Sequence, residues 1–273
     1  MSATILRPRS ALTLPVEAEN ISPDRFDGLK QAAVGALPLL CGREWVPLGD
    51  LFEVLGDGSA KIVLEGGLGH VKRIGQGMSR GSITIHGSAG LHLGAEMTGG
   101  EITANSNVGG WAGAEMRGGL LHIRGDAGPM LGGTYPGERR GMSGGVILVE
   151  GNAGARVGER MRRGLIVVKG SIGDFAGVGM IAGSLFAFGR LGARPGAGMK
   201  RGSIVALGGL ADGLLPTFCF ACRFAPGFLR VYLSHLRRWG MPVTQDHIDG
   251  LFNRYTGDIT TLGKGEILIY DQH

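Results

Sequence analysis

The chain has 273 residues, of which 53 are glycine and 11 are proline. Glycine is thus roughly a fifth of the chain, against about 7% on average, yet no stretch keeps it at every third position, which excludes collagen. Hydrophobic residues make up 43% and charged residues 19%, which is too apolar for a disordered chain. No apolar run reaches the roughly 18 residues of a membrane helix, and the formal charge of +5 permits an anionic partner without identifying one.

The N-terminus and the cysteines indicate the compartment. Residues 1–10 contain no continuous apolar segment followed by a small-residue cleavage site, so we expect no signal peptide. Three cysteines, an odd number, argue against a secreted disulfide framework. We therefore expect a cytoplasmic protein that engages neither a membrane nor nucleic acid.

Residues 1–55 form a first segment that lacks the repeat of the following residues. We predict a strand-like start at Ala11–Leu14, a turn at Pro23–Leu29, and a lead into the repeat at Gly49–Leu55. This segment is expected to cap the first repeat unit, which would otherwise present an open edge.

A repeat with a period of 19 residues occupies residues 56–210. One interval is 26 residues long, because it holds a seven-residue insertion within Gly133–Arg140. Glycine stands three residues after each repeat methionine, and aliphatic residues or alanine stand five and seven after it. A weaker eighth unit, with Ile62 and Leu64 in the same phase, precedes them. The repeat methionines are Met78, Met97, Met116, Met142, Met161, Met180 and Met199.

These spacings predict a mainly β fold. Aliphatic residues two apart indicate a strand with one face inward, and glycines at fixed offsets indicate corners such as Gly164. A unit of this length cannot bury its own face, so neighbouring units must stack. We predict a parallel β-helix of about seven to eight 19-residue coils. Left-handed β-helices use a hexapeptide period, so a period of 19 favours the right-handed form.

Residues 211–273 form a helical and strand segment that is expected to pack on the β-helix. We predict an amphipathic helix at Gly227–Trp239, a second helix from an N-cap at Thr244 through Tyr255, and a last strand at Gly265–Tyr270. The apolar face expected for the first helix is formed by Phe228, Tyr232, Leu236 and Trp239. The outward strand positions of the later coils, from Val146 to Leu207, are apolar. Either the C-terminal helix or another subunit must cover them, and we favour the helix.

Catalytic and metal-binding motifs are weak. Cys219 and Cys222 form a single CxxC among phenylalanines, so we expect buried apolar cysteines rather than a metal or redox site. No Ser/His/Asp set or carboxylate pair stands out, and Glu96, Glu115 and Glu159 are expected at a solvated corner. We therefore predict no catalytic residue and no metal ligand in this chain.

A basic ridge at the methionine corners is the best functional candidate. Stacked coils would place these side chains close together, and arginine binds carboxylates or phosphates in a bidentate manner. The alternative is a solvated edge that prevents strand aggregation. The residues after methionine are Arg80, Arg117, Arg162, Arg163, Lys200 and Arg201, and those before it are Arg139, Arg140 and Arg160.

The repeat also carries a family resemblance, from about Leu48 to the end of the chain. The chain resembles the C subunit of formylmethanofuran dehydrogenase and its bacterial counterpart in the formyltransferase/hydrolase complex of methylotrophs. The glycine-rich repeat is also similar to the C-terminal domain of glutamate synthase. The matching residues are Gly66–Gly69, Arg73–Met78, Gly141–Gly145, Met161–Gly164, Arg194–Met199, Arg254–Asp258 and Gly263–Ile267.

The resemblance implies a non-catalytic subunit of a complex for one-carbon metabolism and formaldehyde oxidation. Such a complex moves a formyl group from tetrahydromethanopterin to a methanofuran-type carrier and hydrolyses it to formate. The implied partners are a metal-dependent hydrolase subunit, a formyltransferase subunit and a molybdopterin-subunit-like chain, with the metal on partner subunits. The carrier's glutamate-rich tail is the expected ligand for the ridge of Arg139, Arg140, Arg160, Arg162, Arg163, Lys200 and Arg201.

Three alternatives stay open. The chain could be the C subunit of a tungsten or molybdenum enzyme that reduces carbon dioxide, which no motif here separates from the hydrolytic complex. It could instead be a glutamate-synthase-type domain that works with an amidotransferase. A β-helix enzyme acting on polysaccharide would need clustered carboxylates and usually secretion, and the sequence favours neither.

Overall fold

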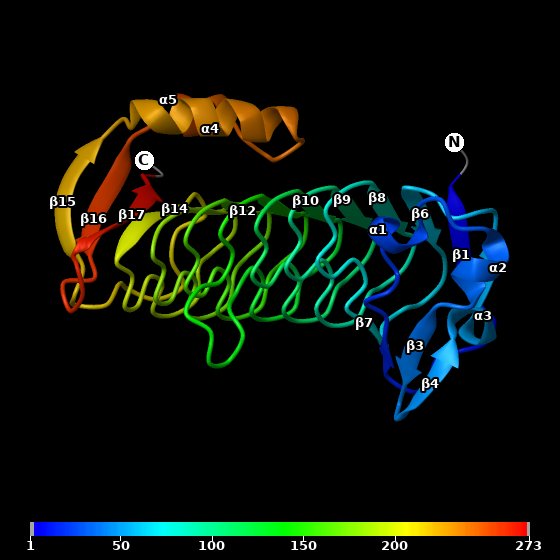
Figure 1. The fold of residues 1–273 in the computed structure, drawn as a ribbon. Coiled ribbons are helices and arrows are strands. Elements are labelled where there is room, and N and C mark those ends of the chain that lie inside the picture. Colours follow the sequence, from blue (N-terminus) through cyan, green and yellow to red (C-terminus); the bar gives the residue numbers. More distant parts are fainter. Residues whose placement is uncertain (1–2, 272–273) are drawn as a thin grey trace.

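The structure, a computed structural model, describes residues 3–271. The expectation about a signal peptide also rests on residues 1 and 2, which lie outside this range. Figure 1 shows an elongated molecule in which the middle of the chain winds into stacked coils. The N-terminal segment lies at one end of the stack and the C-terminal segment at the other.

One sheet of 13 strands, most of them parallel, follows the length of the stack. Partners in neighbouring coils are 19 residues apart, as are Ile83 and Ile102. At the insertion the separation grows to 26, because Leu120 pairs with Val146. The eighth unit also pairs in parallel, with Ile62 opposite Ile83 at a separation of 21 residues. The coil strands are β6 (Lys61–Leu64), β8 (Ser82–Ile85), β9 (Glu101–Ala104), β10 (Leu120–Ile123), β11 (Val146–Val149), β12 (Leu165–Val168), β13 (Ser184–Ala187) and β14 (Arg201–Ala206).

A second line of backbone contacts joins the coils outside this sheet. Parallel bridges step from coil to coil, and the methionine corners are also linked, as where the Thr98 N–H donates to the Met78 carbonyl at 2.8 Å. The predicted mainly β architecture is therefore confirmed. The bridges run through Leu68, Ala89, Val108, Ala127, Ala153, Ile172, Leu191 and Leu210.

The repeat methionines fill the interior of the coil corners, and all seven have 0% exposure. The glycine three residues after each one has a positive φ, which is +102° at Gly164. A Cβ atom on Gly164 would lie 2.8 Å from Cε of Met142 and 2.9 Å from the Gly145 carbonyl oxygen. The methyl group of one coil's methionine thus occupies the space that the next coil's glycine leaves open.

The N-terminal segment extends the large sheet and adds a small one. β1 (Thr4–Pro8) pairs with β6 in parallel and with β5 (Phe52–Leu55) in antiparallel orientation. The strand predicted at Ala11–Leu14 is wrong, because no neighbouring strand pairs with these residues. The remaining elements are β2 (Val16–Glu17), α1 (Pro23–Phe26), α2 (Gln31–Gly35), β3 (Pro38–Cys41), β4 (Glu44–Pro47), α3 (Leu48–Leu51) and β7 (Val71–Lys72), with β2, β3, β4 and β7 in the small sheet.

The C-terminal segment continues the large sheet through β17 (Lys264–Tyr270), β16 (Phe252–Gly257) and the edge strand β15 (Cys219–Phe224). The predicted first helix is confirmed as α4 (Gly227–Arg238). The second, α5 (Gln245–Asp249), has the expected N-cap at Thr244. Its predicted extension to Tyr255 is wrong, because residues 252–257 pair with β17 instead.

α4 covers the apolar outer face of the later coils, as favoured from the sequence. Leu229, Leu233 and Leu236 are buried in one cluster with Val167 and Phe186 of the sheet. In Figure 1, α4 and α5 lie across the top of the coils at the C-terminal end. None of the helices within residues 3–271 has the length and apolar character that crossing a membrane requires.

The contact between Met142 and Gly164 predicts a large effect of a side chain at this corner. Gly164→Val should lower the free energy of unfolding by roughly 3 kcal/mol, because it adds left-handed backbone strain to overpacking. Denaturant unfolding measures the loss. Gly67→Val is the matched control, since a Cβ atom on Gly67 would have no neighbour within 4 Å and the backbone there has no positive φ. Equal stability of the two variants would contradict the corner assignment.

Candidate functional site

The corner that precedes each coil strand carries the basic side chains. Methionine turns inward at this corner, so the residues after it lie at the surface. The backbone there is tied to the previous coil, as where the Arg162 N–H donates to the Met142 carbonyl at 2.8 Å. The fold therefore spaces the basic side chains by one coil each.

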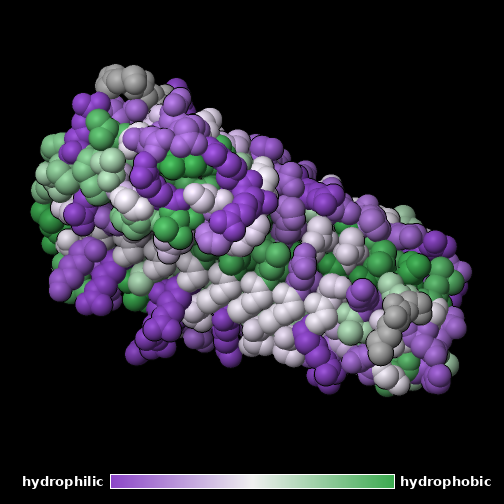
Figure 2. Space-filling model, turned by 90° about the horizontal axis from the view of Figure 1, so that it is seen from above, coloured by the Kyte–Doolittle hydropathy of each residue, from purple (hydrophilic) through white to green (hydrophobic). Residues whose placement is uncertain are grey.

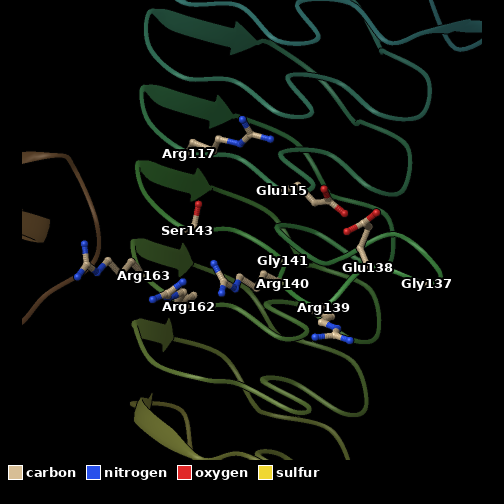
Figure 3. Close-up of a pocket in the computed structure, with 10 residues that line it drawn as sticks. All are labelled: Glu115, Arg117, Gly137, Glu138, Arg139, Arg140, Gly141, Ser143, Arg162 and Arg163. Atoms are coloured by element: carbon tan, nitrogen blue, oxygen red, sulfur yellow. The ribbon is translucent and has the colours of Figure 1, made fainter.

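The insertion turns part of this ridge into an open hollow of about 750 Å³. In Figure 3, Arg117, Arg140, Arg162 and Arg163 lie on the side of the strands. The carboxylates of Glu115 and Glu138 lie on the side of the insertion. The lining residues are Glu115, Arg117, Gly137, Glu138, Arg139, Arg140, Gly141, Ser143, Arg162 and Arg163.

A second hollow, of about 730 Å³, adjoins the first and shares Arg162 and Arg163 with it. Lys200 and Arg201 also line it, together with Tyr232 and Leu262 of the C-terminal segment. Six of the seven predicted ridge residues thus lie in two connected hollows: Arg139, Arg140, Arg162, Arg163, Lys200 and Arg201.

Two basic residues have other roles. Arg160 does not line either hollow; its guanidinium donates to the Glu138 carbonyl at 3.0 Å and so supports the insertion. Arg80 lies at the N-terminal end, where it forms ion pairs with Asp24 and Asp27. The structure therefore removes Arg80 and Arg160 from the set of side chains that could receive a ligand.

The remaining guanidinium groups are available to a ligand. Within residues 3–271, the salt bridges involve other side chains and none joins Arg117, Arg140, Arg162 or Arg163. Unpaired arginines in one hollow create a positive potential that attracts an anion, and each can hold a carboxylate or phosphate by two hydrogen bonds. The chemistry offered here is anion binding.

Tyr135 fastens the start of the insertion to the coils. Its hydroxyl lies 2.9 Å from Nδ1 of His92, and its N–H donates to Oε1 of Glu115 at 3.0 Å. The His92 ring stacks on Trp111 with centroids 5.5 Å apart. Burial raises the pKa of Tyr135 to about 12. Burial, aided by the Arg73 guanidinium, holds the pKa of His92 below its ordinary value, which favours the neutral ring.

Sequence reasoning missed several residues of this site. Glu115 was expected in a solvated corner, but it anchors the insertion and lines the hollow. Glu159 is buried rather than solvated, and it accepts from Arg156 at 2.7 Å. The contact between Tyr135 and His92 spans 43 residues. Only the position of Tyr135 inside the insertion hinted at a special role.

The expected burial of Cys219 and Cys222 is wrong. Both are exposed, because β15 is the edge strand of the sheet and most of its residues face solvent. Phe218 is buried and Phe224 is partly buried, but Phe220, between the two cysteines, is exposed. Within the described part of the chain, no group of three or more His, Cys, Asp or Glu residues is arranged to hold a metal ion.

The Tyr135 anchor predicts how firmly the insertion is held. Tyr135→Phe removes a hydrogen bond of about 1 kcal/mol, so tryptic cleavage after Arg139 and Arg140 should become about fivefold faster. A digestion time course read by mass spectrometry measures the rate. Tyr232→Phe is the control, because within residues 3–271 the Tyr232 hydroxyl has no hydrogen-bond partner. An unchanged rate would show that the hydroxyl does not hold the loop.

The chain has curated relatives in two groups. The C subunit of the tungsten-containing formylmethanofuran dehydrogenase 2 of Methanothermobacter thermautotrophicus is 43% identical over 35% of this chain and 37% of the relative. Its counterpart in the molybdenum-containing enzyme 1 of Methanosarcina barkeri is 39% identical over 34% of this chain and 33% of the relative. The C subunit of the formyltransferase/hydrolase complex Fhc of Methylorubrum extorquens is 40% identical over 32% of this chain and 33% of the relative.

These alignments span about a third of each curated relative, and no protein-family model matches the chain. The structural comparison covers more. A chain in the crystal structure of the formyltransferase/hydrolase complex (FhcABCD) from Methylorubrum extorquens in complex with methylofuran matches with a TM-score of 0.92. It is 38% identical, and the match covers 98% of this chain and 100% of that chain. The chain therefore belongs to the family formed by the C subunits of the formyltransferase/hydrolase complex and of formylmethanofuran dehydrogenase.

Proposed function

We propose that this chain is a structural subunit, without an active site of its own, of a formyltransferase/hydrolase complex. In that complex a formyl group passes from formyl-tetrahydromethanopterin to a methanofuran-type carrier, and water then cleaves the formyl amide to formate and the free amine. The observation that carries the proposal is the near full-length match, with a TM-score of 0.92, to a chain of the FhcABCD complex. The groups that react are assigned to partner chains: a metal-dependent hydrolase subunit, a formyltransferase subunit and a molybdopterin-subunit-like chain.

We propose that the basic hollows hold the glutamate-rich tail of the carrier. The unpaired guanidinium groups of Arg140, Arg162 and Arg163 fit carboxylates, which are the groups that such a tail repeats. The second hollow adds Lys200 and Arg201 along the same edge, so the positive surface is long enough for several carboxylates. Glu115 and Glu138 repel anions at the insertion wall, which would set where the tail ends.

A second candidate, the C subunit of a carbon-dioxide-reducing formylmethanofuran dehydrogenase, is supported by a separate observation. The tungsten-containing relative is 43% identical over its aligned region, against 40% for the relative from the Fhc complex. The hydrolytic complex is preferred because its crystal structure matches almost the whole chain. Identification of the partner subunits separates the two.

Three further features remain predictions that accompany this proposal: the form of the coils, the limits of the three segments and the cellular location. We propose that the stacked coils form a right-handed parallel β-helix, because left-handed β-helices use a hexapeptide period and the period here is 19 residues. The division into a capping segment 1–55, a β-helix 56–210 and a C-terminal segment 211–273 follows from the limits of the repeat. A cytoplasmic location is the expectation for this metabolic role.

Affinity purification of the tagged chain from its native host tests the structural role. We expect the co-purifying chains to include a metal-dependent hydrolase subunit and a formyltransferase subunit, as identified by mass spectrometry. Recovery of a tungsten or molybdenum reductase subunit with electron-transfer partners would select the carbon-dioxide-reducing branch. Recovery of the chain alone would contradict both readings.

The carrier-tail proposal predicts a selective loss of anion binding. Arg162→Ser with Arg163→Ser should weaken binding of a γ-linked polyglutamate probe at low salt by about tenfold or more, because two charge-assisted contacts are lost. Isothermal titration on the folded chain measures the affinity. Arg124→Ser with Arg190→Ser is the matched control, since both residues are exposed, lie outside the hollows and carry the same charge. Equal affinity in the two double variants would refute a specific site.

A further inference from the structure

α4 presents two apolar faces. One packs on the sheet, and the other is largely exposed apart from the Tyr232 ring, whose centroid lies 5.6 Å from that of Phe186. Leu229, Leu233 and Leu236 form the face that packs on the sheet. A second stripe along the same helix holds Val231 and Tyr232, and Trp239 follows at its C-terminal end. Val231 is 61% exposed and Trp239 is 44% exposed. With His235 between them, Val231 and Trp239 form a stripe with a spacing of four residues, which is typical of a helix face that contacts another element.

This second face borders an apolar groove. Val231, Tyr232, His235 and Trp239 line one side, and Leu165 at the start of β12 lines the other. The volume of the groove is about 310 Å³. Its floor continues along the sheet, because Leu120 and Val146 occupy the same register position as Leu165 in the two preceding coils and are only partly buried. Figure 2, seen from this side, shows hydrophobic patches among the hydrophilic side chains of the C-terminal segment.

One border of the groove is strongly cationic. Tyr232 lines both the groove and the adjoining hollow, where Arg162, Arg163, Lys200 and Arg201 are found. Within residues 3–271, the salt bridges leave all four of these cations unpaired. At the far end of α4, Arg238 adds an exposed guanidinium next to Trp239. The surface thus combines an apolar, aromatic floor with basic flanks.

We infer that this groove seats an apolar segment of a partner polypeptide with carboxylates on its flanks. The inference rests on the proposed function, in which the chain is one subunit of a complex. Aromatic residues and arginines together are the residue types that contribute most to protein interfaces. Acidic flanks on the partner would pair with Arg238 and with those cations of the border that the carrier's tail does not engage, which speeds association and fixes the register.

Charge argues against a second copy of this chain as the occupant. A two-fold interface would bring the same patch of each copy together. Arg162, Arg163 and Arg201 of one copy would then face the equivalent cations of the other, and like charges at an interface oppose binding. A partner with complementary charge has no such cost.

Site-specific photo-cross-linking in the assembled complex tests the groove. p-Benzoyl-phenylalanine replaces Val231 in the tagged full-length chain, which is produced in its native host. We expect a cross-link to a different polypeptide, within a peptide that has an apolar centre and Asp or Glu within a few residues. The same probe in place of Leu14, which is 57% exposed at the other end of the molecule, should not cross-link to that peptide.

A charge substitution gives the second readout. Val231→Asp should lower the yield of the cross-linked partner in the purified complex at least tenfold, while the thermal melt stays within a degree because the side chain is exposed. Leu14→Asp should leave the yield unchanged.

The outcomes separate the groove from the proposed function. If the unmodified chain recovers no partner at all, the proposed function fails and the groove fails with it. If partners are recovered but position 231 cross-links to a second copy, to a peptide without acidic residues, or to nothing, only the groove inference is overturned.

Discussion

The structure depends on one contact that recurs at most of the coils, the methyl group of a methionine beneath the glycine of the next coil. A Cβ atom on Gly164 would lie 2.8 Å from Cε of Met142, and one on Gly183 would lie 2.9 Å from Cε of Met161. Methionine suits this position because its unbranched, flexible side chain fills irregular space. The glycine is required both by its positive φ and by the methyl group beneath it. This pairing fixes the distance between coils, and therefore the spacing of the arginines that follow each methionine.

Another set of corner residues, stacked from coil to coil in a column, shows that the corners do not always need glycine. Five residues before methionine, the backbone is left-handed at His92, Trp111, Phe175 and Arg194, with φ between +55° and +64°. This conformation costs a non-glycine residue roughly 1–2 kcal/mol. The side chains offset part of that cost by stacking on each other, His92 on Trp111 and Arg194 over Phe175 at 5.6 Å. Tyr135 joins this column, so the anchor of the insertion depends on corners that keep large side chains.

How much of the molecule could be predicted depends on whether a contact follows the repeat. The strand register, the buried methionines and the glycine corners are periodic, so the sequence is sufficient to predict them. The helix α4 was also predictable from its amphipathic spacing, but its buried face was not. Of the expected face only Leu236 is buried, whereas Phe228, Tyr232 and Trp239 are exposed. Leu229 and Leu233 pack on the sheet in their place. Residues 252–257 were not, since their strand depends on pairing with β15 and β17, which no local pattern indicates. Likewise Tyr135 meets His92 across the insertion, and no local pattern indicates such a contact.

The insertion also marks a boundary in the chemistry of the coils. The outward strand position that holds Thr84 is polar before the insertion, as at His122. After the insertion the same register position is apolar, as at Val167 and Phe186. Only the apolar half needs a cover, and α4 supplies it.

The basic hollows begin at this same boundary, because the insertion walls the first and the C-terminal segment closes the second. Two departures from the repeat therefore act on one edge of an otherwise uniform stack. The regular coils hold that edge rigid, and the irregular segments give it a concave, charged shape that a bare solenoid corner would lack.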